Sequence, residues 1–550
     1  MKFFCGDFTH NFSRNLKMST KNITLQKSNH TPSVYQQAIY DYIKDETGNI
    51  LCQAAAGAGK TSTIVGSLQF IPEGKSILML SFNKSIAVEL SARVPTHVIV
   101  NTFNALGHST LFSLLNKSIT LNNFKKSDIV KIEYAKFLSG EGSGRTPDYV
   151  AELYRYQNEV VTLVQYAMRM GIVPNKPFVL TDGTVLDIRY DLETGYIDNF
   201  ESWNKLANRY DIQIPNEFML DAIEIAANTI VRNTVIAHEQ GIIDFDDQIY
   251  LPVIHNTCIM KQYDYVFVDE CQDLSALRLA LVEQVVGDRV IFVGDSRQCL
   301  YGFTGSDIEV FDKIESKFRV TEFPLSISYR CAKLVVHEAQ ALVPSIEASN
   351  AAKLGEVNHL GYKWSLNDIN RGDLIVSRCN APLLGLAWDL FNEGNAVCIL
   401  GKDIGKTMIN LIKKIKTQDI AVMLIGINQH LEAERTKWAT EGKEHFVSGL
   451  EDRVRAIEAI VKRSCYRSVN ELMTMIESRF AEQSPHGRIT LGTIHKCKGL
   501  ESDTVWFLNQ EAIPVKYAKQ SWQLEQEYNA KYVGITRAIS TLNYISLAKD

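Results

Sequence analysis

The segment Ile50–Ser62 constrains the fold of this chain more than any other. It reads ILCQAAAGAGKTS, which is an apolar strand, a loop of small residues and the start of a helix. Gly57 and Gly59 let the loop turn its N–H groups inward, towards the same concavity that the helix N-terminus faces. Lys60 supplies a charge for the β- and γ-phosphates of a nucleotide, and the Thr61 hydroxyl is a ligand for Mg²⁺. The segment predicts a phosphate-binding loop in an α/β fold.

The loop departs from the usual phosphate-loop pattern at one position. The pattern G-x-x-x-x-G-K-[ST] starts with glycine, whereas this chain has Ala54. The alternative interpretation, a turn of small residues beside a surface lysine, therefore stays open on this stretch alone. If the loop holds a nucleoside triphosphate, the residues that contact it are Ala56, Gly57, Ala58, Gly59, Lys60, Thr61 and Ser62.

Composition limits the class of protein. At 550 residues the chain is too long for a single core, and we expect about three or four domains. The net charge of −5 gives no sign of a nucleic-acid-binding protein, so any such site must be a local basic groove. The 10 cysteines include no C-x-x-C pair, which favours reduced thiols in a reducing compartment. No apolar run is long enough to cross a membrane.

A second motif carries the acids that a nucleotide-hydrolysing site needs. An apolar strand ends in Asp269 and Glu270. Opposite a phosphate loop, Asp269 would hold Mg²⁺ and Glu270 would orient or deprotonate the attacking water. Acids at a strand end could instead cap the next helix, but the combination with Lys60 makes that interpretation weaker. Gln298, in a later loop, can reach the γ-phosphate, and Gln36 can read an adenine edge, although glutamines in helices are usually solvated.

Aromatic and polar residues follow several of the predicted strands. Phe82 and Asn83 follow one strand, and Phe103 and Asn104 follow the next. Ligands in open α/β sheets lie outside the carboxyl ends of the strands, so these residues predict a platform for bases and phosphates. The alternative is that both phenylalanines belong to the core. In the loop after Gln298, two further aromatic side chains can stack on bases: Tyr301 and Phe303.

Two long segments lack this β/α pattern. Residues 111–234 have helical periodicity, clearest over Tyr149–Met170, where one face is apolar and Gly171 is a stop signal. Residues 405–486 are also helical, with mixed charge. Residues 1–30 are polar and predict a flexible tail, in which Met18 is an alternative start. We found no chemistry in the helical segments.

Taken in order, the motifs resemble those of the UvrD/Rep-type superfamily 1A DNA helicases. The most specific are DECQD (269–273), VGDSRQCLYGF (293–303), TIHKCKGLE (493–501) and YVGITRA (532–538). The matching segments extend from Gln36 to Arg537. The runs DFDD (244–247) and YRC (329–331) are most similar to the F-box DNA helicase branch and its phage relatives, although we see no F-box.

The resemblance implies an α/β fold of two RecA-like P-loop NTPase lobes, each a parallel sheet flanked by helices and interrupted by a helical insertion. It implies ATP and Mg²⁺ in the cleft between the lobes. The expected division is residues 31–110 and 235–320 for the first lobe, 111–234 for its insertion, 321–404 and 487–550 for the second lobe, and 405–486 for the smaller second insertion.

The resemblance also implies roles for single residues. Arg330 and Arg537 would be arginine fingers from the second lobe, and Tyr329 would stack on adenine. Gln36 would read the adenine edge, and Glu501 would contact the ribose. The residues implied for the DNA track are Phe82, Asn83, Phe103, Asn104, Tyr301, Phe303, His495 and Lys496.

The chain departs from the family pattern in three ways, at two positions and in the length of one segment. Many relatives carry an arginine after Gly-Lys-Thr that packs on adenine, where this chain has Ser62. The usual histidine after Thr-Phe is Asn104. The second insertion is shorter than in the large bacterial members. These departures bear on base selectivity, on charge in the DNA track, and on regulation or partner binding through the insertion.

The function that we expect is an ATP-dependent DNA helicase that moves 3′→5′ on single-stranded DNA and unwinds duplexes. The polarity rests on the resemblance alone. Single-stranded and tailed duplex DNA would be the partners, together with replication or recombination proteins, and we expect no membrane partner. We expect the protein in the cytoplasm, at the nucleoid, or in the host cytoplasm if the protein is viral. The alternatives are a translocase that displaces bound proteins with little unwinding, and a DNA-binding module with a relic ATP site. No nuclease-like acidic cluster follows Arg537.

Overall fold

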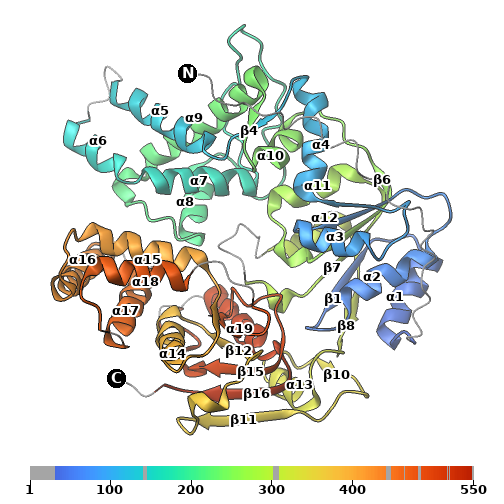
Figure 1. Cartoon of the computed structure of the whole chain (residues 1–550). Coiled ribbons are helices and arrows are strands. Elements are labelled where there is room, and N and C mark those ends of the chain that lie inside the picture. The colour runs from blue at the N-terminus through green and yellow to red at the C-terminus, as the bar shows by residue number, and fades with distance from the viewer. Residues whose placement is uncertain are drawn as a thin grey trace, which may run out of the picture.

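The computed structural model contains two six-stranded parallel sheets and two groups of helices (Figure 1). It describes residues 31–139, 145–300, 309–440, 447–463, 465–480, 485–516, 518 and 521–547. In Figure 1 the first sheet lies at the right, below a large helical group, and the second sheet lies at the bottom, with a smaller helical group to its left. We call the first sheet with its flanking helices the first lobe, and the second sheet with its flanking helices the second lobe.

The first sheet has six strands in the order β3-β2-β6-β7-β1-β8, and every pairing is parallel. The strands are β1 (Ile50–Ala54), β2 (Ile77–Ser81), β3 (Ile99–Thr102), β6 (Tyr263–Asp269), β7 (Val286–Gly294) and β8 (Thr321–Leu325). Aliphatic runs such as Ile77–Ser81 are buried along their whole length, as expected where helices cover both faces of a parallel sheet.

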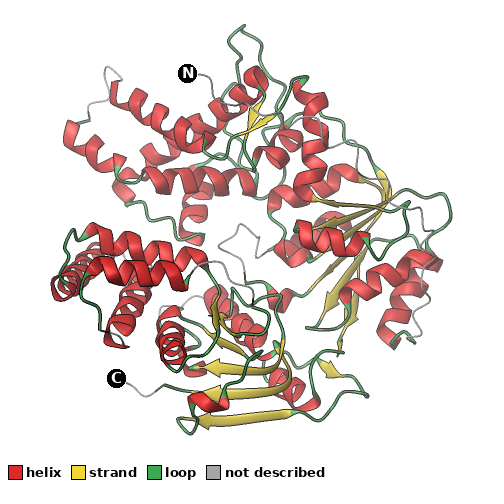
Figure 2. Cartoon of the chain, viewed as in Figure 1, coloured by secondary structure: helices red, strands yellow, loops and turns green. Residues whose placement is uncertain are grey.

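Helices cover this sheet, as Figure 2 shows. They are α1 (Val34–Asp45), α2 (Lys60–Ser67), α3 (Lys84–Ser91), α4 (Phe103–Leu115), α10 (Asp247–Ile254), α11 (Ala276–Val285) and α12 (Val310–Phe318). The start of α1 is fixed by a capping box in which Ser33 and Gln36 each bond the backbone of the other. Helix α2 starts directly at Lys60, so its N-terminus faces the phosphate loop.

The first helical insertion contains α5 (Lys125–Ser139), α6 (Pro147–Tyr154), α7 (Gln157–Met170), α8 (Phe200–Arg209) and α9 (Asn216–Gln240). The single helix predicted over Tyr149–Met170 is wrong, because the chain breaks between α6 and α7 around Tyr156. Gly171 ends α7 in the left-handed conformation, as predicted. A two-stranded parallel sheet of β4 (Thr120–Leu121) and β5 (Ile242–Ile243) joins the insertion to the first lobe.

The second sheet also has six parallel strands, in the order β11-β16-β15-β12-β14-β13. They are β11 (Glu356–Gly361), β12 (Leu374–Ser377), β13 (Val397–Ile399), β14 (Ile489–Thr493), β15 (Ser502–Leu508) and β16 (Ala538–Ile545). Its helices are α13 (Lys333–Gln340), α14 (Asn380–Asn392) and α19 (Ser521–Ile535), and a small parallel pair is formed by β9 (Ile327–Ser328) and β10 (Glu347–Ala348).

The second helical insertion contains α15 (Lys402–Lys414), α16 (Ile420–Thr440), α17 (Ser448–Arg463) and α18 (Val469–Arg479). Its core, centred on side chains such as Trp438 and Ile457, is separate from the cores of the sheets. The predicted fold class, two RecA-like lobes of parallel sheet flanked by helices, is confirmed. No helix in the described ranges is long and apolar enough to cross a membrane.

Two elements cross the expected domain limits. Strand β8 pairs with β1 in the first sheet, so this sheet extends beyond residue 320, where we expected the second lobe to begin. Strand β8 is the edge strand of this sheet, so β1 has a parallel neighbour on each side, β7 and β8. Helix α9 continues to Gln240, past the expected end of the first insertion at residue 234.

Candidate active site in the cleft between the lobes

A cleft of about 880 Å³ lies between the two lobes. It gathers most of the residues that the sequence assigned to nucleotide binding. From the first lobe it is lined by Gly57, Ala58, Gly59, Lys60, Thr61, Ser62, Glu270 and Gln298, and from the second by Tyr329, Arg330, Glu501 and Arg537. Gln36, Ala56 and Asp269 lie behind these residues and are buried.

The phosphate loop has the backbone that its glycines predicted. Gly57 and Gly59 have φ values of 72° and 77°, in the region that favours glycine. Gly59 is also the residue before α2, so the loop leads directly into the helix N-terminus. Such a loop can present N–H groups to an anion.

Lys60 and Glu270 form an ion pair in the cleft. Lys60 Nζ lies 2.8 Å from Glu270 Oε2. Glu270 has a positive φ of 54°, which is uncommon for a residue other than glycine and directs the side chain from the end of β6 into the cleft. Burial alone would raise the pKa of Glu270, but the Lys60 ammonium outweighs it and holds the pKa at about 2. Glu270 is therefore ionised and can accept a hydrogen bond from water.

Asp269 lies deeper than Glu270. Its side chain accepts a hydrogen bond from the Glu270 backbone N–H at 2.9 Å. Burial, and then the charge of Glu270, raise the pKa of Asp269 to about 7. A divalent cation would favour the charged form of such an acid. Mg²⁺ in nucleotide sites is held by one or two protein oxygen ligands together with phosphate oxygens, so Asp269 and Thr61 fit this ion. Within the described residues, no three His, Cys, Asp or Glu side chains gather into a metal cluster of their own.

A chain of hydrogen bonds connects Gln298 to Glu270. Gln298 Nε2 donates to Asp295 Oδ2 at 2.6 Å, and the Asp295 backbone N–H donates to Gln272 Oε1 at 3.0 Å. The Gln272 amide in turn donates to the Glu270 carboxylate. Burial raises the pKa of Asp295 to about 6. Sequence reasoning did not assign Gln272 or Asp295, although both lie inside motifs that it singled out.

The two arginines of the second lobe line the cleft but are held by their own lobe. Arg330 Nε lies 2.5 Å from Glu501 Oε2. The Arg537 guanidinium donates to the carbonyl oxygens of Val533 at 3.0 Å and Leu500 at 3.2 Å. Burial, and then the charge of Arg330, lower the pKa of Arg537 to about 10. Both guanidinium groups line the same cleft as the phosphate loop, and as arginine fingers they would have to exchange these contacts for phosphate oxygens.

At the predicted base-binding end, Tyr329 is 39% exposed. Gln36 is 7% exposed, and both ends of its amide are used, since it accepts from the Ser33 N–H and donates to Thr63 Oγ1, each at 3.0 Å. Sequence reasoning missed Arg93, which lines the cleft and donates to Ser62 Oγ at 3.3 Å. Nothing in the local sequence indicates this contact, because it joins α2 to the end of α3.

Several contacts join the lobes across the cleft, and none was predicted. Lys498 Nζ lies 2.8 and 2.9 Å from the two carboxylate oxygens of Asp273, and both side chains are about nine-tenths buried. The Ala56 backbone N–H donates to the Tyr532 hydroxyl at 2.9 Å. The motifs that contain these residues indicated only that the residues belong to the site. No local sequence pattern shows which residues of the two lobes bond each other, because the partners are far apart in the sequence.

The predicted DNA-track residues have different environments. Phe82 and Asn83 line the cleft; the Phe82 ring faces the Arg278 guanidinium at 4.5 Å, and Asn83 caps α3. Phe103 is 2% exposed and packs in the core, so the prediction that its ring lines the track is wrong and the core alternative holds. The Asn104 amide donates to the Phe245 carbonyl at 2.9 Å.

On the second lobe, Lys496 is exposed and His495 is half-buried. Burial, and then the charge of Arg378, lower the pKa of His495 to about 3. Its imidazole is therefore neutral at physiological pH, and the positive charge in this turn comes from its lysines. Tyr301 and Phe303 lie outside the described residues.

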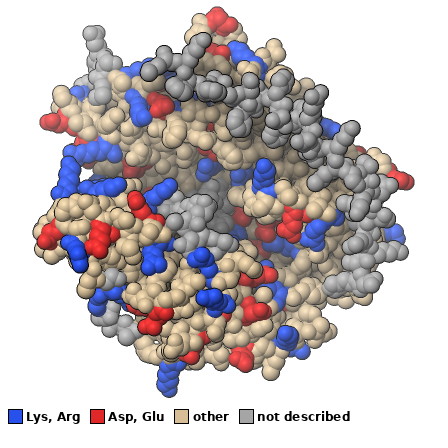
Figure 3. Space-filling view, in the orientation of Figure 1, with Lys and Arg blue, Asp and Glu red and all other residues tan. Residues whose placement is uncertain are grey.

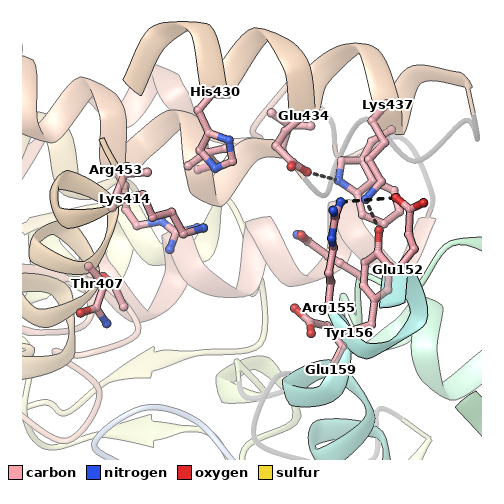
Figure 4. A pocket seen from close by; sticks show the side chains of 16 residues that line it. Glu152, Arg155, Tyr156, Glu159, Thr407, Lys414, His430, Glu434, Lys437 and Arg453 are labelled. Atoms are coloured by element: carbon pink, nitrogen blue, oxygen red, sulfur yellow. Dashed lines mark hydrogen bonds and ion pairs between the residues drawn. The ribbon is translucent and has the colours of Figure 1, made fainter. Parts of the chain in front are cut away.

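A second cavity, of about 640 Å³, lies between the two helical insertions. Figure 4 shows Tyr156 of the first insertion facing Lys437 of the second. The Lys437 ammonium bonds the Tyr156 hydroxyl and lies 4.7 Å from the centre of its ring. Figure 3 shows Lys and Arg side chains gathered on the left of this face, beside the hollow between the upper and lower halves.

Comparisons with known proteins identify relatives of this chain. The sequence profile of the UvrD/REP helicase N-terminal domain matches residues 35–319. F-box DNA helicase 1 of Gallus gallus is 23% identical over 526 residues, which cover 92% of this chain and 48% of that protein. F-box DNA helicase protein 1 of Schizosaccharomyces pombe is 24% identical, over 51% of this chain and 33% of the relative.

A bacterial relative, the ATP-dependent DNA helicase Rep of Salmonella typhimurium, is 23% identical over 54% of this chain and 41% of its own length. The chain therefore spans between a third and a half of the length of these three relatives.

Proposed function

Because the chain belongs to the UvrD/REP helicase family, we propose that it is an ATP-dependent DNA helicase that moves 3′→5′ on single-stranded DNA and unwinds duplexes. The observation that carries the proposal is the single cleft in which Lys60 and Glu270 of one lobe face Arg330 and Arg537 of the other. Such a site hydrolyses a nucleotide only when the lobes close on it, so hydrolysis can alternate with movement of the lobes along a strand.

The residues that the sequence assigned to the nucleotide have the following roles in this proposal. When ATP enters, Lys60 exchanges Glu270 for the β- and γ-phosphates, which frees Glu270 to orient or deprotonate water. Thr61 and Asp269 would hold Mg²⁺, which would neutralise charge on the phosphate oxygens. Gln298 senses the γ-phosphate, and Arg330 and Arg537 stabilise the transition-state charge, as arginine fingers do. Tyr329 stacks on the base, Gln36 reads its edge and Glu501 contacts the ribose.

Phe82, Asn83, Asn104, His495 and Lys496 are the described residues that we assign to the DNA track, on single-stranded or tailed duplex DNA. We also propose the domain limits expected from the sequence, except that the first lobe includes β8 and the first insertion extends to the end of α9. The relatives are named as DNA helicases, which supports a role in DNA replication, recombination or repair. The protein would act on DNA in the cytoplasm, or in the host's cytoplasm if the protein is viral.

Two alternatives make different predictions. A translocase that displaces bound proteins would hydrolyse ATP on single strands but unwind poorly. A DNA-binding module with a relic ATP site would not hydrolyse ATP, and the complete set of Lys60, Glu270, Gln298 and Arg537 argues against it.

The test is a strand-displacement assay on duplexes with a 3′ or a 5′ single-stranded tail, run beside DNA-stimulated ATP hydrolysis. We expect unwinding of the 3′-tailed duplex only. Lys60→Ala should abolish hydrolysis and unwinding while DNA binding remains, because the substitution removes the phosphate contact and leaves the DNA track intact. Wild-type hydrolysis by this variant would contradict the assignment of the ATP site. Unwinding from the 5′ tail would contradict the polarity.

A further inference from the structure

The second lobe touches the phosphate loop through the loop's own backbone. The Ala56 N–H donates to the Tyr532 hydroxyl at 2.9 Å. At the next residue, the Gly57 carbonyl accepts from the Tyr329 N–H, also at 2.9 Å. Ala56 and Tyr532 are 0% and 1% exposed, so water cannot replace the first of these bonds while the lobes are together. Two consecutive residues of the phosphate loop, Ala56 and Gly57, are thus hydrogen-bonded to the second lobe.

The approach at this point is close enough to require glycine. A Cβ atom on Gly57 would lie 2.5 Å from the Cβ of Arg330 and 3.0 Å from Ser328 Oγ. The φ of 72° would also strain any other residue. The segment Ser328–Arg330 of the second lobe therefore rests directly on the loop, beside the Tyr532 hydroxyl. Opening of the cleft would separate all of these contacts together.

Tyr532 lies on the helix that leads directly to Arg537. Helix α19 ends at Ile535, immediately before Thr536 and Arg537. Side chains of the two residues after the helix bond the carbonyl groups of its last turn. Thr536 Oγ1 donates to the Tyr532 carbonyl at 2.9 Å, and Arg537 Nε donates to the Val533 carbonyl at 3.0 Å. A shift of Tyr532 relative to the loop must therefore move Arg537 as well.

We propose that Tyr532 is a positioning residue that links closure of the lobes to the shape of the phosphate loop. Its hydroxyl holds the Ala56 amide when the lobes are closed and releases it when they open. The loop therefore takes the geometry for hydrolysis only while α19 and Arg537 are in place. This inference rests on the proposed ATPase activity, and it concerns the chain's own residues rather than the nucleotide.

The test is Tyr532→Phe, which removes one oxygen atom and keeps the ring. Without the hydroxyl, the Ala56 N–H is buried and unbonded in the closed form, and an unpaired buried donor disfavours that form. We expect kcat for DNA-stimulated ATP hydrolysis to fall by roughly tenfold or more. KM for ATP should stay within about twofold, because the residues that we assign to the phosphates from the first lobe are unchanged.

Tyr544→Phe is the matched control. Tyr544 is also buried in the second lobe, and its hydroxyl bonds Glu338 Oε1 at 2.9 Å, away from the cleft. Both variants lose one buried tyrosine hydroxyl, so we expect similar decreases in melting temperature, but only Tyr532→Phe should lose turnover. Wild-type kcat in Tyr532→Phe would overturn the inference. The inference would also be overturned if kcat fell by the same factor in both variants, in proportion to the decrease in melting temperature.

The two proposals fail in distinguishable ways. If wild-type protein does not hydrolyse ATP under any DNA condition, the proposed function fails and the inference fails with it. If wild-type protein hydrolyses ATP and Lys60→Ala does not, the ATP site is established. An unchanged kcat in Tyr532→Phe then overturns only the role of Tyr532.

Discussion

At the scale of single residues, the side chains that line the cleft bond partners in their own lobe, and in the proposed function a nucleotide would replace these bonds. Lys60 bonds a carboxylate instead of a phosphate, and Arg330 bonds Glu501. Arg93 donates a hydrogen bond to Ser62 Oγ at 3.3 Å. The motifs predicted Lys60, Glu270, Arg330 and Glu501, because the chemistry of these residues is fixed by the proposed reaction. Arg93 could not be predicted, since its role depends on how α3 packs beside α2.

Arg93 should contribute to nucleotide binding but not to hydrolysis. Its guanidinium lines the same cleft as Tyr329, and a cation close to the face of a base is attracted to it. We expect Arg93→Ala to raise KM for ATP several-fold with kcat little changed, which is the signature of lost ground-state binding. Adding Ser62→Arg to this variant should restore KM, because the new arginine would occupy the space that Arg93 reaches. Steady-state kinetics on the single and double variants test this, and an unchanged KM in Arg93→Ala would refute it.

At the scale of elements, the sequence predicted strands better than helix breaks. The strand expected before Asp269 is present as β6, because an apolar run followed by acids is a local signal. The break between α6 and α7 was missed. Tyr156 lies at that break, with its ring 5.6 Å from the ring of Phe218 and 4.7 Å from the Lys437 ammonium. These partners come from distant helices, so the periodicity around Tyr156 could not reveal them.

A pair of histidines should make the first insertion sensitive to acid. His238 in α9 and His255 after α10 lie with their Nε2 atoms 2.9 Å apart. Burial, then nearby Lys117 and Lys125, lower the pKa of His238 to about 4. Burial, then His238, lower that of His255 to about 3. Below its ordinary pKa of about 6.5, each histidine binds a proton in the unfolded chain but not in the folded one.

Stability from this pair is therefore complete above about pH 6.5 and is lost as the pH falls towards 4. We expect the free energy of unfolding to decrease by about 1–2 kcal/mol between pH 7.5 and 5.5, after allowance for partial solvent screening. Urea unfolding at several pH values measures this slope. His238→Gln should reduce the slope whatever it does to stability at pH 7.5. An identical slope in the variant would show that other groups cause the acid sensitivity.

At the scale of the whole molecule, the contacts that join the lobes were beyond sequence reasoning. The motifs indicated that both lobes contribute to one site, and the fold class followed from the resemblance. The pairing of Lys498 with Asp273, or of Ala56 with Tyr532, depends on the relative position of two sheets that are separated by long helical insertions. The same is true of the bond between Lys437 and Tyr156, which joins the insertions.

The Lys498–Asp273 pair should transmit DNA binding to the catalytic carboxylates. Lys498 belongs to the turn that contains His495 and exposed Lys496, which we assign to the DNA track. At the other end of the pair, Asp273 follows Glu270 by one turn, and its backbone N–H bonds the Glu270 carbonyl at 2.9 Å. A strand that shifts the turn would therefore shift the loop that presents Glu270.

Asp273→Asn keeps the size and hydrogen-bonding capacity of the side chain but removes its charge. We expect basal, DNA-free ATP hydrolysis to stay within a few-fold of wild type, because the two lobes can still close. Stimulation by single-stranded DNA should fall about tenfold, because a shift of the DNA-binding turn would no longer shift the loop that presents Glu270. Breaking a buried ion pair also destabilises a protein by about 3–5 kcal/mol when one charge is left uncompensated. Melting temperature must therefore be measured on the same preparation.

Lys498→Met, which removes the other charge and keeps a long apolar chain, should uncouple stimulation in the same way. Equal losses of basal and stimulated hydrolysis in both variants would mean that the pair only holds the lobes together and carries no signal between them.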